Sequence, residues 1–372
     1  MSPLNLKKKL VNCFKELNQP ILWEQNLEEV SPLQNVERDE TFDVLKGIAI
    51  ILVIVGHSEI GPLNPFISSF HMPLFFFVAG YFLKIRLISK EIQLSFSRLI
   101  IPYIFATTCV CFIAICKDAV DFTWADGSSS SNVILAHLFG YQGLHFPNWL
   151  TEHIGVLWFI WALFWARLFS IFFIRNIRSI FTLCIVFITT GFVGMFLNKL
   201  FFLPFCIPQG MCAASFLFVG YLMKKTNFIV SAQLQHLVLF LEVIWFYSWM
   251  RGGVGMNNCN FNAGYVFGLV GAVGAFVAIY TIVKYLYQKN AILWRAALIC
   301  GRYSLVIYCV HAVETSTCNW RAFAVLHHIP LEYFALFQIS TRFAVAAIFT
   351  IVLLKIKPIR EQIFQIKSSF RE

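Results

Sequence analysis

The sequence predicts an all-α polytopic membrane bundle, because it is strongly apolar, poor in charge and rich in long uncharged segments. Of its 372 residues, 59% are hydrophobic and only 13% are charged. A soluble domain is about half apolar and a quarter charged, so this chain lacks the polar surface to fold in water alone. Its net charge of +10 would suggest nucleic acid for a soluble protein. In a membrane protein, the positive residues are instead concentrated on one side of the bilayer. The expected partner is therefore lipid and not nucleic acid.

Ten segments are long and apolar enough to cross a hydrocarbon core of about 30 Å, which takes about 20 helical residues. Each segment is bounded by charged residues or by Pro, Gly or Asn. The sixth and ninth contain internal polar residues and fit the pattern least well. The ten segments are residues 42–60, 66–83, 99–116, 153–173, 180–197, 203–223, 234–250, 262–283, 297–317 and 334–354.

The basic residues predict how these segments are oriented. If the N-terminus is cytoplasmic, most of the 29 Lys and Arg residues fall in cytoplasmic connections. Only Lys117, Lys199, Arg251 and Arg321 fall outside. Positive residues are enriched on the cytoplasmic side, so both termini are predicted there. The chain then divides into a cytoplasmic N-terminal arm (1–41), a ten-helix membrane domain (42–354) and a basic cytoplasmic tail (355–372).

The first segment carries the most informative polar residues, Asp43, Lys46 and His57. Eleven residues separate Lys46 from His57, so on a helix they point within about 20° of one another, about 16.5 Å apart along the axis. Ionisable groups within a bilayer cost about 2.5–3.5 kcal/mol each, which favours a polar passage over lipid. The alternative is that Lys46 reaches the cytoplasmic interface beside Asp43 while His57 is merely interfacial.

Further polar residues extend this pattern. His71 and a helix-kinking Pro73 begin the second segment near the level of His57, and Arg98 begins the third on the cytoplasmic side. Glu242 and Arg342 lie deep in the seventh and tenth segments, where they either neutralise one another or line a pathway. No metal site is predicted, because no HxxxH or HExxH spacing occurs and the acidic residues are dispersed.

Two features outside the segments leave alternatives open. The eleven Cys residues show no CxxC pair, so most are expected to be small buried apolar residues. Cys259 and Cys318 are both predicted outside, where they either pair or stay free. The outer connection 117–152 is Ser-rich and then aromatic, at Trp124, Tyr141, Phe146 and Trp149. It is either a lid or acceptor platform, or a solvated loop.

The polar pattern of the first two segments resembles the acyltransferase-3 superfamily, bacterial integral-membrane enzymes that O-acetylate glycans, and its fucose 4-O-acetylase-like branch most of all. Weaker matches follow along residues 40–355. The first block is Asp43, Lys46-Gly47, Gly56-His57, Phe70-His71-Met72-Pro73-Leu74-Phe75-Phe76 and Gly80-Tyr81. The weaker matches are Arg98 with Pro102-Tyr103, Leu157-Trp158-Phe159, and Gly301-Arg302-Tyr303-Ser304-Leu305 continuing to Tyr308 and His311.

The resemblance implies a ten-helix enzyme of the bacterial cytoplasmic (inner) membrane with no bound cofactor. Acetyl-CoA would be the donor substrate from the cytoplasm, and a glycan or its lipid-linked precursor the acceptor outside. Ser95 stands where members commonly carry the first Arg of an R-x-x-R pair. The implied roles are catalytic for His57 and His71, donor-binding for Lys46 and Arg98, and substrate-binding for Trp158, His311 and Asp43.

Two mechanisms and one other function fit these residues. His57 is expected to act as general base on a sugar hydroxyl, or else to carry the acetyl group transiently. His71 would orient His57 or the acceptor. The rival function is a transporter or exporter of a glycan or small polar solute, for which a polar stripe in a helix bundle is equally natural. The sequence makes no prediction of oligomeric state.

Overall fold

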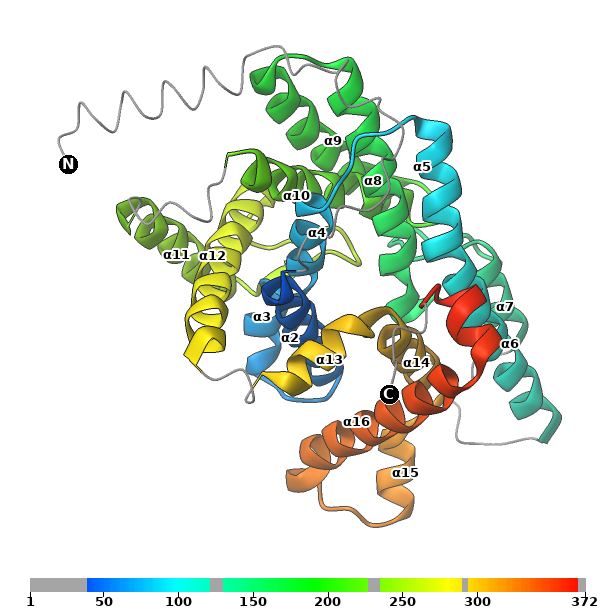
Figure 1. Cartoon of the computed structure of the whole chain (residues 1–372). Coiled ribbons are helices and arrows are strands. Elements are labelled where there is room, and N and C mark those ends of the chain that lie inside the picture. Colours follow the sequence, from blue (N-terminus) through cyan, green and yellow to red (C-terminus); the bar gives the residue numbers. More distant parts are fainter. Residues whose placement is uncertain (1–38, 121–129, 227–234, 290–293, 367–372) are drawn as a thin grey trace.

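The computed structural model describes residues 39–120, 130–226, 235–289 and 294–366, most of them in helices (Figure 1). Most of the predicted arm and residues 367–372 of the predicted tail lie outside these ranges. The α-helices are α2 (Glu40–Gly56), α3 (Leu63–Ser68), α4 (His71–Tyr81), α5 (Ile88–Ser95), α6 (Ile101–Val120), α7 (Ser130–Leu138), α8 (Trp158–Asn176), α9 (Ile180–Leu200), α10 (Ile207–Lys225), α11 (Gln235–Met250), α12 (Tyr265–Lys289), α13 (Arg295–Arg302), α14 (Ser304–Thr317), α15 (Trp320–Leu326) and α16 (Leu331–Lys355).

Short elements link these helices. Two π-helical turns are η2 (Phe96–Ile100) and η5 (Ile359–Ile363), and one 3₁₀ turn is η3 (Gly155–Leu157). A two-stranded antiparallel hairpin pairs β1 (Val254–Gly255) with β2 (Asn260–Phe261). The hairpin and α15 were not predicted from the sequence, because each is too short to carry a periodic pattern.

The predicted all-α membrane bundle is confirmed at the level of its helices. In the described part of the chain, every one of the ten predicted segments is mainly helical. Six helical stretches are long and apolar enough to cross a membrane, and a bent pair makes a seventh if counted as one crossing. The six are Leu63–Tyr81, Ile88–Asp118, Gly155–Asn176, Ile180–Leu200, Tyr265–Leu286 and Glu332–Lys355. The remaining predicted crossings correspond to α2, α10 and α11.

The second and third predicted segments have different boundaries in the structure. The second breaks between α3 and α4, at Ser69 and Phe70, and not at Pro73. Pro73 is the third residue of α4, where a missing amide hydrogen costs nothing. The third is longer than predicted, because α5, η2 and α6 run on continuously. The wide turn of η2 lies just before Pro102, which has no N–H to donate to the preceding turn.

The ninth predicted segment is bent by 78° where α13 meets α14. The α13 arm packs closely along the first half of α2. A Cβ atom on Gly47 would lie 1.7 Å from the Ala297 carbonyl oxygen, and one on Gly301 would lie 1.7 Å from the Asp43 carbonyl oxygen. Small residues that let two backbones approach are typical of helix contacts in membranes. This contact explains why α13 leaves the line of α14.

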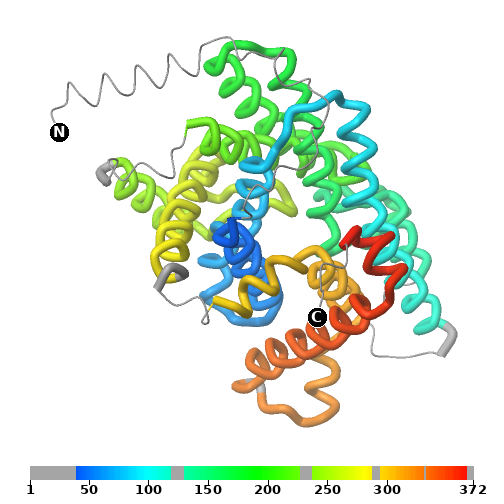
Figure 2. Tube along the Cα trace, viewed as in Figure 1, coloured from blue at the N-terminus to red at the C-terminus, as the bar shows by residue number. Residues whose placement is uncertain are grey.

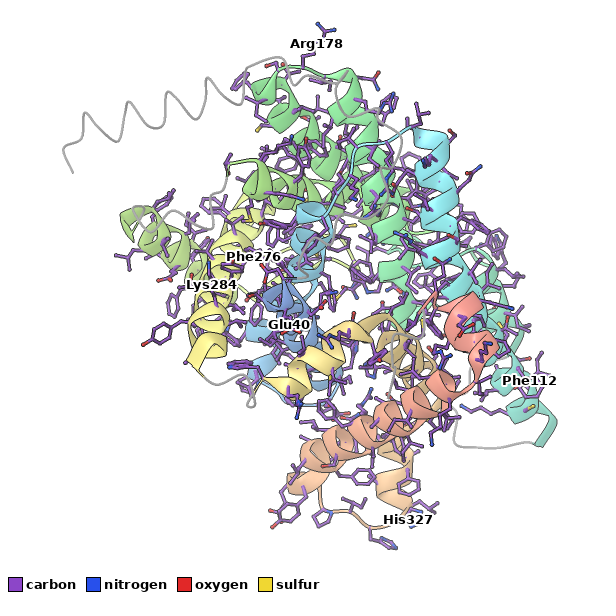
Figure 3. The ribbon with its side chains drawn as sticks, in the orientation of Figure 1. Glu40, Phe112, Arg178, Phe276, Lys284 and His327 are labelled. Atoms are coloured by element: carbon purple, nitrogen blue, oxygen red, sulfur yellow. The ribbon has the colours of Figure 1, made fainter. Side chains whose placement is uncertain are left out.

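Helix α2 lies near the centre of the bundle, where it contacts α4, α12, α13 and α14 (Figures 1 and 2). Large apolar side chains cover the periphery, as expected of a surface in lipid. Phe112, for example, is 65% exposed and points away from the edge of the bundle in Figure 3. Arg178 and His327, predicted on opposite sides of the membrane, lie at opposite ends of that view.

The outer connection is packed over its described part. Residues 130–138 form α7, and Tyr141 and Leu150 are each only 1% exposed. The hydroxyl of Tyr103 donates to the His137 carbonyl and so joins α6 to the end of α7. The solvated-loop alternative is therefore wrong for residues 130–143, whereas several of residues 144–152 are exposed. Trp124 lies outside the described residues.

Candidate active site

The face of α2 that joins Lys46 to His57 points into the protein. Ile50 and Val53, which lie between them on this face, are 0% and 1% exposed. At the N-terminal end of this face, the Lys46 ammonium lies 2.7 Å from a carboxylate oxygen of Asp43, whose side chain is 4% exposed. The polar residues of α2 are therefore directed at neighbouring helices and not at lipid.

At its other end, α2 brings His57 against a histidine of a second helix. His57 caps the end of α2, and its ring centroid lies 5.4 Å from that of His311 on α14. His71 of α4 and Arg342 of α16 lie within electrostatic range of its ring. His57 stays exposed although it lies among densely packed helices. It is therefore the most accessible member of this group, since His71 is only partly exposed and His311 and Arg342 are buried.

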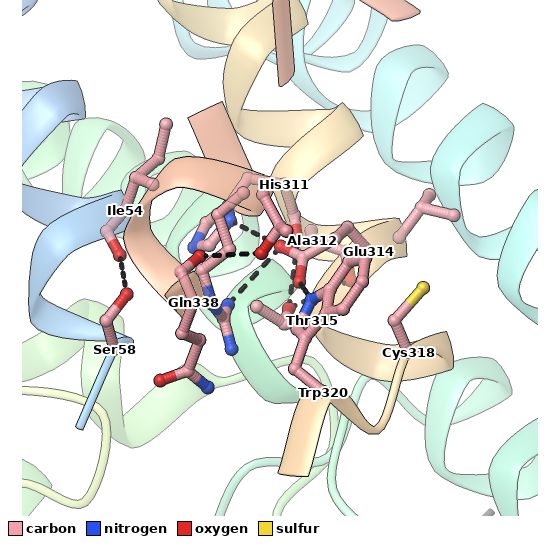
Figure 4. Close-up of polar contacts among 12 residues, drawn as sticks. Ile54, Ser58, His311, Ala312, Glu314, Thr315, Cys318, Trp320 and Gln338 are labelled. Atoms are coloured by element: carbon pink, nitrogen blue, oxygen red, sulfur yellow. Dashed lines mark hydrogen bonds and ion pairs between the residues drawn. The ribbon is translucent and has the colours of Figure 1, made fainter. Parts of the chain in front are cut away.

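His311 is held by a buried carboxylate (Figure 4). Its Nδ1 lies 2.9 Å from Oε2 of Glu314, and a guanidinium nitrogen of Arg342 lies 3.3 Å from the same oxygen. The indole N–H of Trp320 donates to the other oxygen, Oε1. His311 and Glu314 are 1% and 3% exposed, so this contact is shielded from water.

This arrangement fixes the tautomer of His311. A carboxylate only accepts, so Nδ1 carries the hydrogen and Nε2 keeps a lone pair. Nε2 is buried and makes no hydrogen bond within the described part of the chain. His71 is fixed in the same way, because its Nδ1 donates to the Ile67 carbonyl at 2.7 Å. A base whose other nitrogen is held by an acceptor is the usual arrangement for proton transfer.

The residues that follow α2 are anchored to α16 beside His57. The Glu59 amide donates to the Gln338 side-chain oxygen at 2.8 Å, and the Ser58 hydroxyl donates to the Ile54 carbonyl at 3.2 Å. Both Ser58 and Gln338 are labelled in Figure 4. These contacts limit the movement of the His57 backbone.

Sequence reasoning missed part of this cluster. The suggested pairing of Glu242 with Arg342 is wrong, because Arg342 binds Glu314 and Glu242 is partly exposed on α11. The spacing of His311 and Glu314, three residues apart, puts them on one face of a helix and was an available signal. Trp320 lies beyond the end of α14, so no periodicity could have placed it.

The other predicted site residues lie elsewhere. Arg98 is exposed on η2, which packs mainly on α5, α6 and α8, so the structure does not place it beside Lys46. Trp158 begins α8, is 6% exposed and packs edge-on against Phe159. The turn η3 just before it packs on α14, where the Tyr308 hydroxyl donates to the Val156 carbonyl.

Ser95 belongs to a buried ion-pair network. Its hydroxyl donates at 2.8 Å to Glu91, whose side chain is fully buried. Arg167 of α8 contacts the same carboxylate at 2.6 Å, and Arg86 contacts it at 3.6 Å. A guanidinium from α8 and the Ser95 hydroxyl thus contact the same carboxylate.

Pairing of Cys259 with Cys318 is wrong, because both thiols are free. Cys259 is buried close to Cys212, whereas Cys318 follows the end of α14 and is exposed. Within the described ranges, no three His, Cys, Asp or Glu side chains are grouped so as to hold a metal ion.

The long apolar helices define a membrane protein, and the histidines where α2 and α14 meet are groups suited to proton transfer. Comparison with known families assigns it more closely. Residues 39–356 match a family described as an acyltransferase domain. This match covers most of the chain, which therefore belongs to the acyltransferase-3 superfamily.

Two curated relatives are similar over part of their length. The nodulation protein NolL of Mesorhizobium japonicum is 31% identical over 149 residues, which are 36% of this chain and 35% of the relative. NolL of Sinorhizobium fredii is 26% identical over 250 residues, covering 59% of this chain and 60% of the relative. The chain thus spans less than two thirds of either protein. No solved structure matches.

Proposed function

We propose that this protein is a membrane O-acetyltransferase that moves an acetyl group from cytoplasmic acetyl-CoA to a hydroxyl of a cell-surface glycan or its lipid-linked precursor. Its membership of an acyltransferase family supports the reaction class. The observation that carries the proposal is the position of His57, which is accessible, contacts the His311–Glu314 pair and ends the helix that carries Lys46.

In the proposed reaction, a neutral His57 removes the proton of the acceptor hydroxyl as its oxygen attacks the acetyl carbonyl carbon. The new C–O bond forms, the C–S bond of the thioester breaks, and the leaving thiolate takes the proton from His57. General-base catalysis of this kind contributes about 10²–10⁴-fold in rate. An acetyl group carried briefly on His57 is the alternative route.

The neighbouring residues take supporting roles in the proposal. His311, fixed by Glu314, orients the imidazole of His57, and His71 orients His57 or the acceptor. Trp158 lines the acceptor side. At the other end of α2, Lys46 binds the charged end of the donor, with Asp43 setting its position. Arg98 contributes positive charge at the cytoplasmic side.

The topology completes the proposal. Ten crossings with both termini in the cytoplasm of a bacterial inner membrane would place Lys46 on the donor side and His57 on the acceptor side. The donor's phosphates prevent it from crossing, whereas its narrow thioester arm can extend along α2. Catalysis then takes place between the two compartments.

Transfer of radiolabelled acetyl tests the proposal. Membranes from cells that produce the chain are given labelled acetyl-CoA, and the label is expected in a glycan fraction in an amount that depends on the chain. A transporter would instead move an unmodified solute across vesicles without acetylating it. Chain-dependent transport with no acetyl label would overturn the assignment.

The Glu314 carboxylate offers a sharper test of the supporting residues. Glu314→Gln leaves the buried Arg342 charge without its partner, which costs about 3–5 kcal/mol of stability. Acetyl transfer per folded molecule is expected to fall at least about tenfold, because the His311 ring that packs against His57 is no longer held by a carboxylate. Thermal unfolding in detergent and initial rates measure the two effects separately.

A double variant separates orientation from charge balance. Arg342→Met combined with Glu314→Gln removes both charges, so the unfolding temperature is expected to recover while the rate stays low. Recovery of both stability and rate would mean that Glu314 only neutralises Arg342.

A further inference from the structure

We propose that the adenine nucleotide of the acyl donor binds a group of rings and ammonium groups where four helices end. This inference rests on the proposed function, because it concerns the donor of that reaction. We call the group the aromatic–lysine cluster. Its members are Phe42 of α2, with Lys46 one helical turn further along the same face, Tyr81 and Phe82 at the end of α4, Lys224 of α10, and Tyr280 and Lys284 of α12.

The rings of the cluster are assembled around Phe42, which is 2% exposed. Its centroid lies 4.3 Å from that of Tyr81, 4.9 Å from that of Phe82 and 5.8 Å from that of Tyr280. Tyr280 is also buried, but Phe82 is 48% exposed and Tyr81 is partly exposed. The buried rings therefore support two others that present free surface to a ligand.

Ammonium groups lie over these rings. The Lys224 nitrogen is 5.7 Å from the centroid of Tyr81 and 5.8 Å from that of Phe82. The Lys284 nitrogen is 5.7 Å from the centroid of Tyr280. These three distances are within the range of cation–π contacts. Lys224 is also exposed. A carboxylate is present too, since Asp39 acts electrostatically on the Tyr81 and Tyr280 hydroxyls.

Flat apolar rings beside ammonium groups suit a ligand with a planar base and several phosphates. Base–aromatic stacking is worth about 1–3 kcal/mol per base, and charge-assisted hydrogen bonds from lysine hold phosphate oxygens. We assign stacking of the adenine to Phe82 and Tyr81. The phosphates are assigned to Lys224, with Lys46 and Lys284 beside them.

The position of the cluster fits a donor that extends along α2. The start of α2 and the ends of α4, α10 and α12 are the helix ends that the charge pattern predicts to share the cytoplasmic side. Fifteen residues separate Phe42 from His57, which is about 22 Å of helix. A ligand with its nucleotide at one end and its thioester at the other has to span such a length.

The phosphate of an anionic lipid headgroup shares part of this chemistry, and lysines near aromatic rings are common at membrane interfaces. A headgroup brings no base to stack. The two sources therefore differ in their dependence on Phe82, which a nucleotide needs and a phosphate alone does not.

The test compares two donors in the purified full-length protein. Phe82→Ala and Lys224→Ala are each expected to raise the KM for acetyl-CoA about tenfold with kcat nearly unchanged. Neither is expected to alter the kinetics with S-acetylpantetheine, which carries the thioester but no nucleotide. Lys225→Ala is the matched control, since Lys225 is an adjacent, exposed lysine that lies 5.8 Å from the Tyr221 ring, outside the cluster.

Binding measured without turnover separates this proposal from the proposed function. Adenosine 3′,5′-bisphosphate is expected to bind the wild type, and about tenfold more weakly the Phe82→Ala and Lys224→Ala variants. If the wild type acetylates glycans from acetyl-CoA while both variants keep its KM and its nucleotide affinity, the cluster assignment fails and the function stands. If the nucleotide binds as expected but no acetyl is transferred, the cluster stands and the function fails.

Bilayers of different lipid composition provide the remaining comparison. The Lys224→Ala variant is expected to keep its nucleotide defect in bilayers of phosphatidylcholine alone. A defect confined to bilayers that contain phosphatidylglycerol, with normal nucleotide binding, would identify a headgroup site and overturn the proposal.

Discussion

His57→Ala is expected to lower acetyl transfer by about 10²–10⁴-fold while leaving the amount of folded protein in the membrane unchanged. The rate falls because the acceptor hydroxyl loses the group that takes its proton. Folding is preserved because His57 is exposed and caps the end of α2 through its backbone, not its side chain. Initial rates with labelled acetyl-CoA, normalised to folded protein, measure the effect.

The matched control is His327→Ala. His327 follows α15, is exposed and lies at the edge of the molecule in Figure 3, so its removal is expected to leave the rate unchanged. A His57→Ala protein that works at the wild-type rate would exclude His57 as the base. If His311→Ala then proved inactive, the base would be His311, whose Nε2 is free to accept a proton.

The same preparation distinguishes the two chemical routes. If acetyl is carried on His57, incubation with labelled acetyl-CoA but no acceptor should label the wild-type chain and not the His57→Ala chain. Direct transfer leaves both chains unlabelled. The label is followed by rapid quenching and mass spectrometry of the peptide that contains residue 57.

Gly301→Ala is expected to prevent α13 from packing on α2 and to destabilise the bundle by about 3 kcal/mol or more. The added Cβ atom would lie 1.7 Å from the Asp43 carbonyl oxygen, and backbone cannot move aside as a flexible side chain can. Gly47→Ala meets the Ala297 carbonyl oxygen at the same distance and should behave alike. Size-exclusion profiles and thermal unfolding in detergent report the loss.

Gly56→Ala provides the comparison on the same helix. A Cβ atom there meets only Cγ2 of Ile67, at 3.3 Å, which a small side-chain rotation relieves. Alanine also favours helix over glycine by about 1 kcal/mol, so this variant should fold as well as the wild type. Equal stability of the Gly301 and Gly56 variants would contradict the close contact between α2 and α13.

Long apolar segments made most of the fold predictable, since each helix of a membrane protein must satisfy its own backbone. The breaks were not predictable from hydropathy. Pro73 suggested a kink in the second segment, but the helix is interrupted earlier, at Phe70. Proline is tolerated in the first turn of a helix, so Pro73 itself causes no break. The bend at Tyr303 depends on the contact of Gly301 with α2, which only the folded chain reveals.

The parts of the candidate site that lie on one helix were predictable from residue spacing. The Lys46–His57 face followed from helical periodicity, and the Asp43–Lys46 contact is a three-residue spacing. The contact of His57 with His311 joins helices more than 250 residues apart in sequence, so no spacing rule could supply it. The partner of Arg342 was not predictable for the same reason, because depth in the membrane does not determine which buried charges meet.

The 78° bend at Tyr303 has a mechanical consequence. One arm, α13, touches α2 beside Asp43, and the other arm, α14, carries His311 to His57 at the opposite end of the same helix. A single stretch of chain, α13 and α14 together, thus contacts both ends of α2. A change in the length or stiffness of this bend would therefore shift His311 relative to His57.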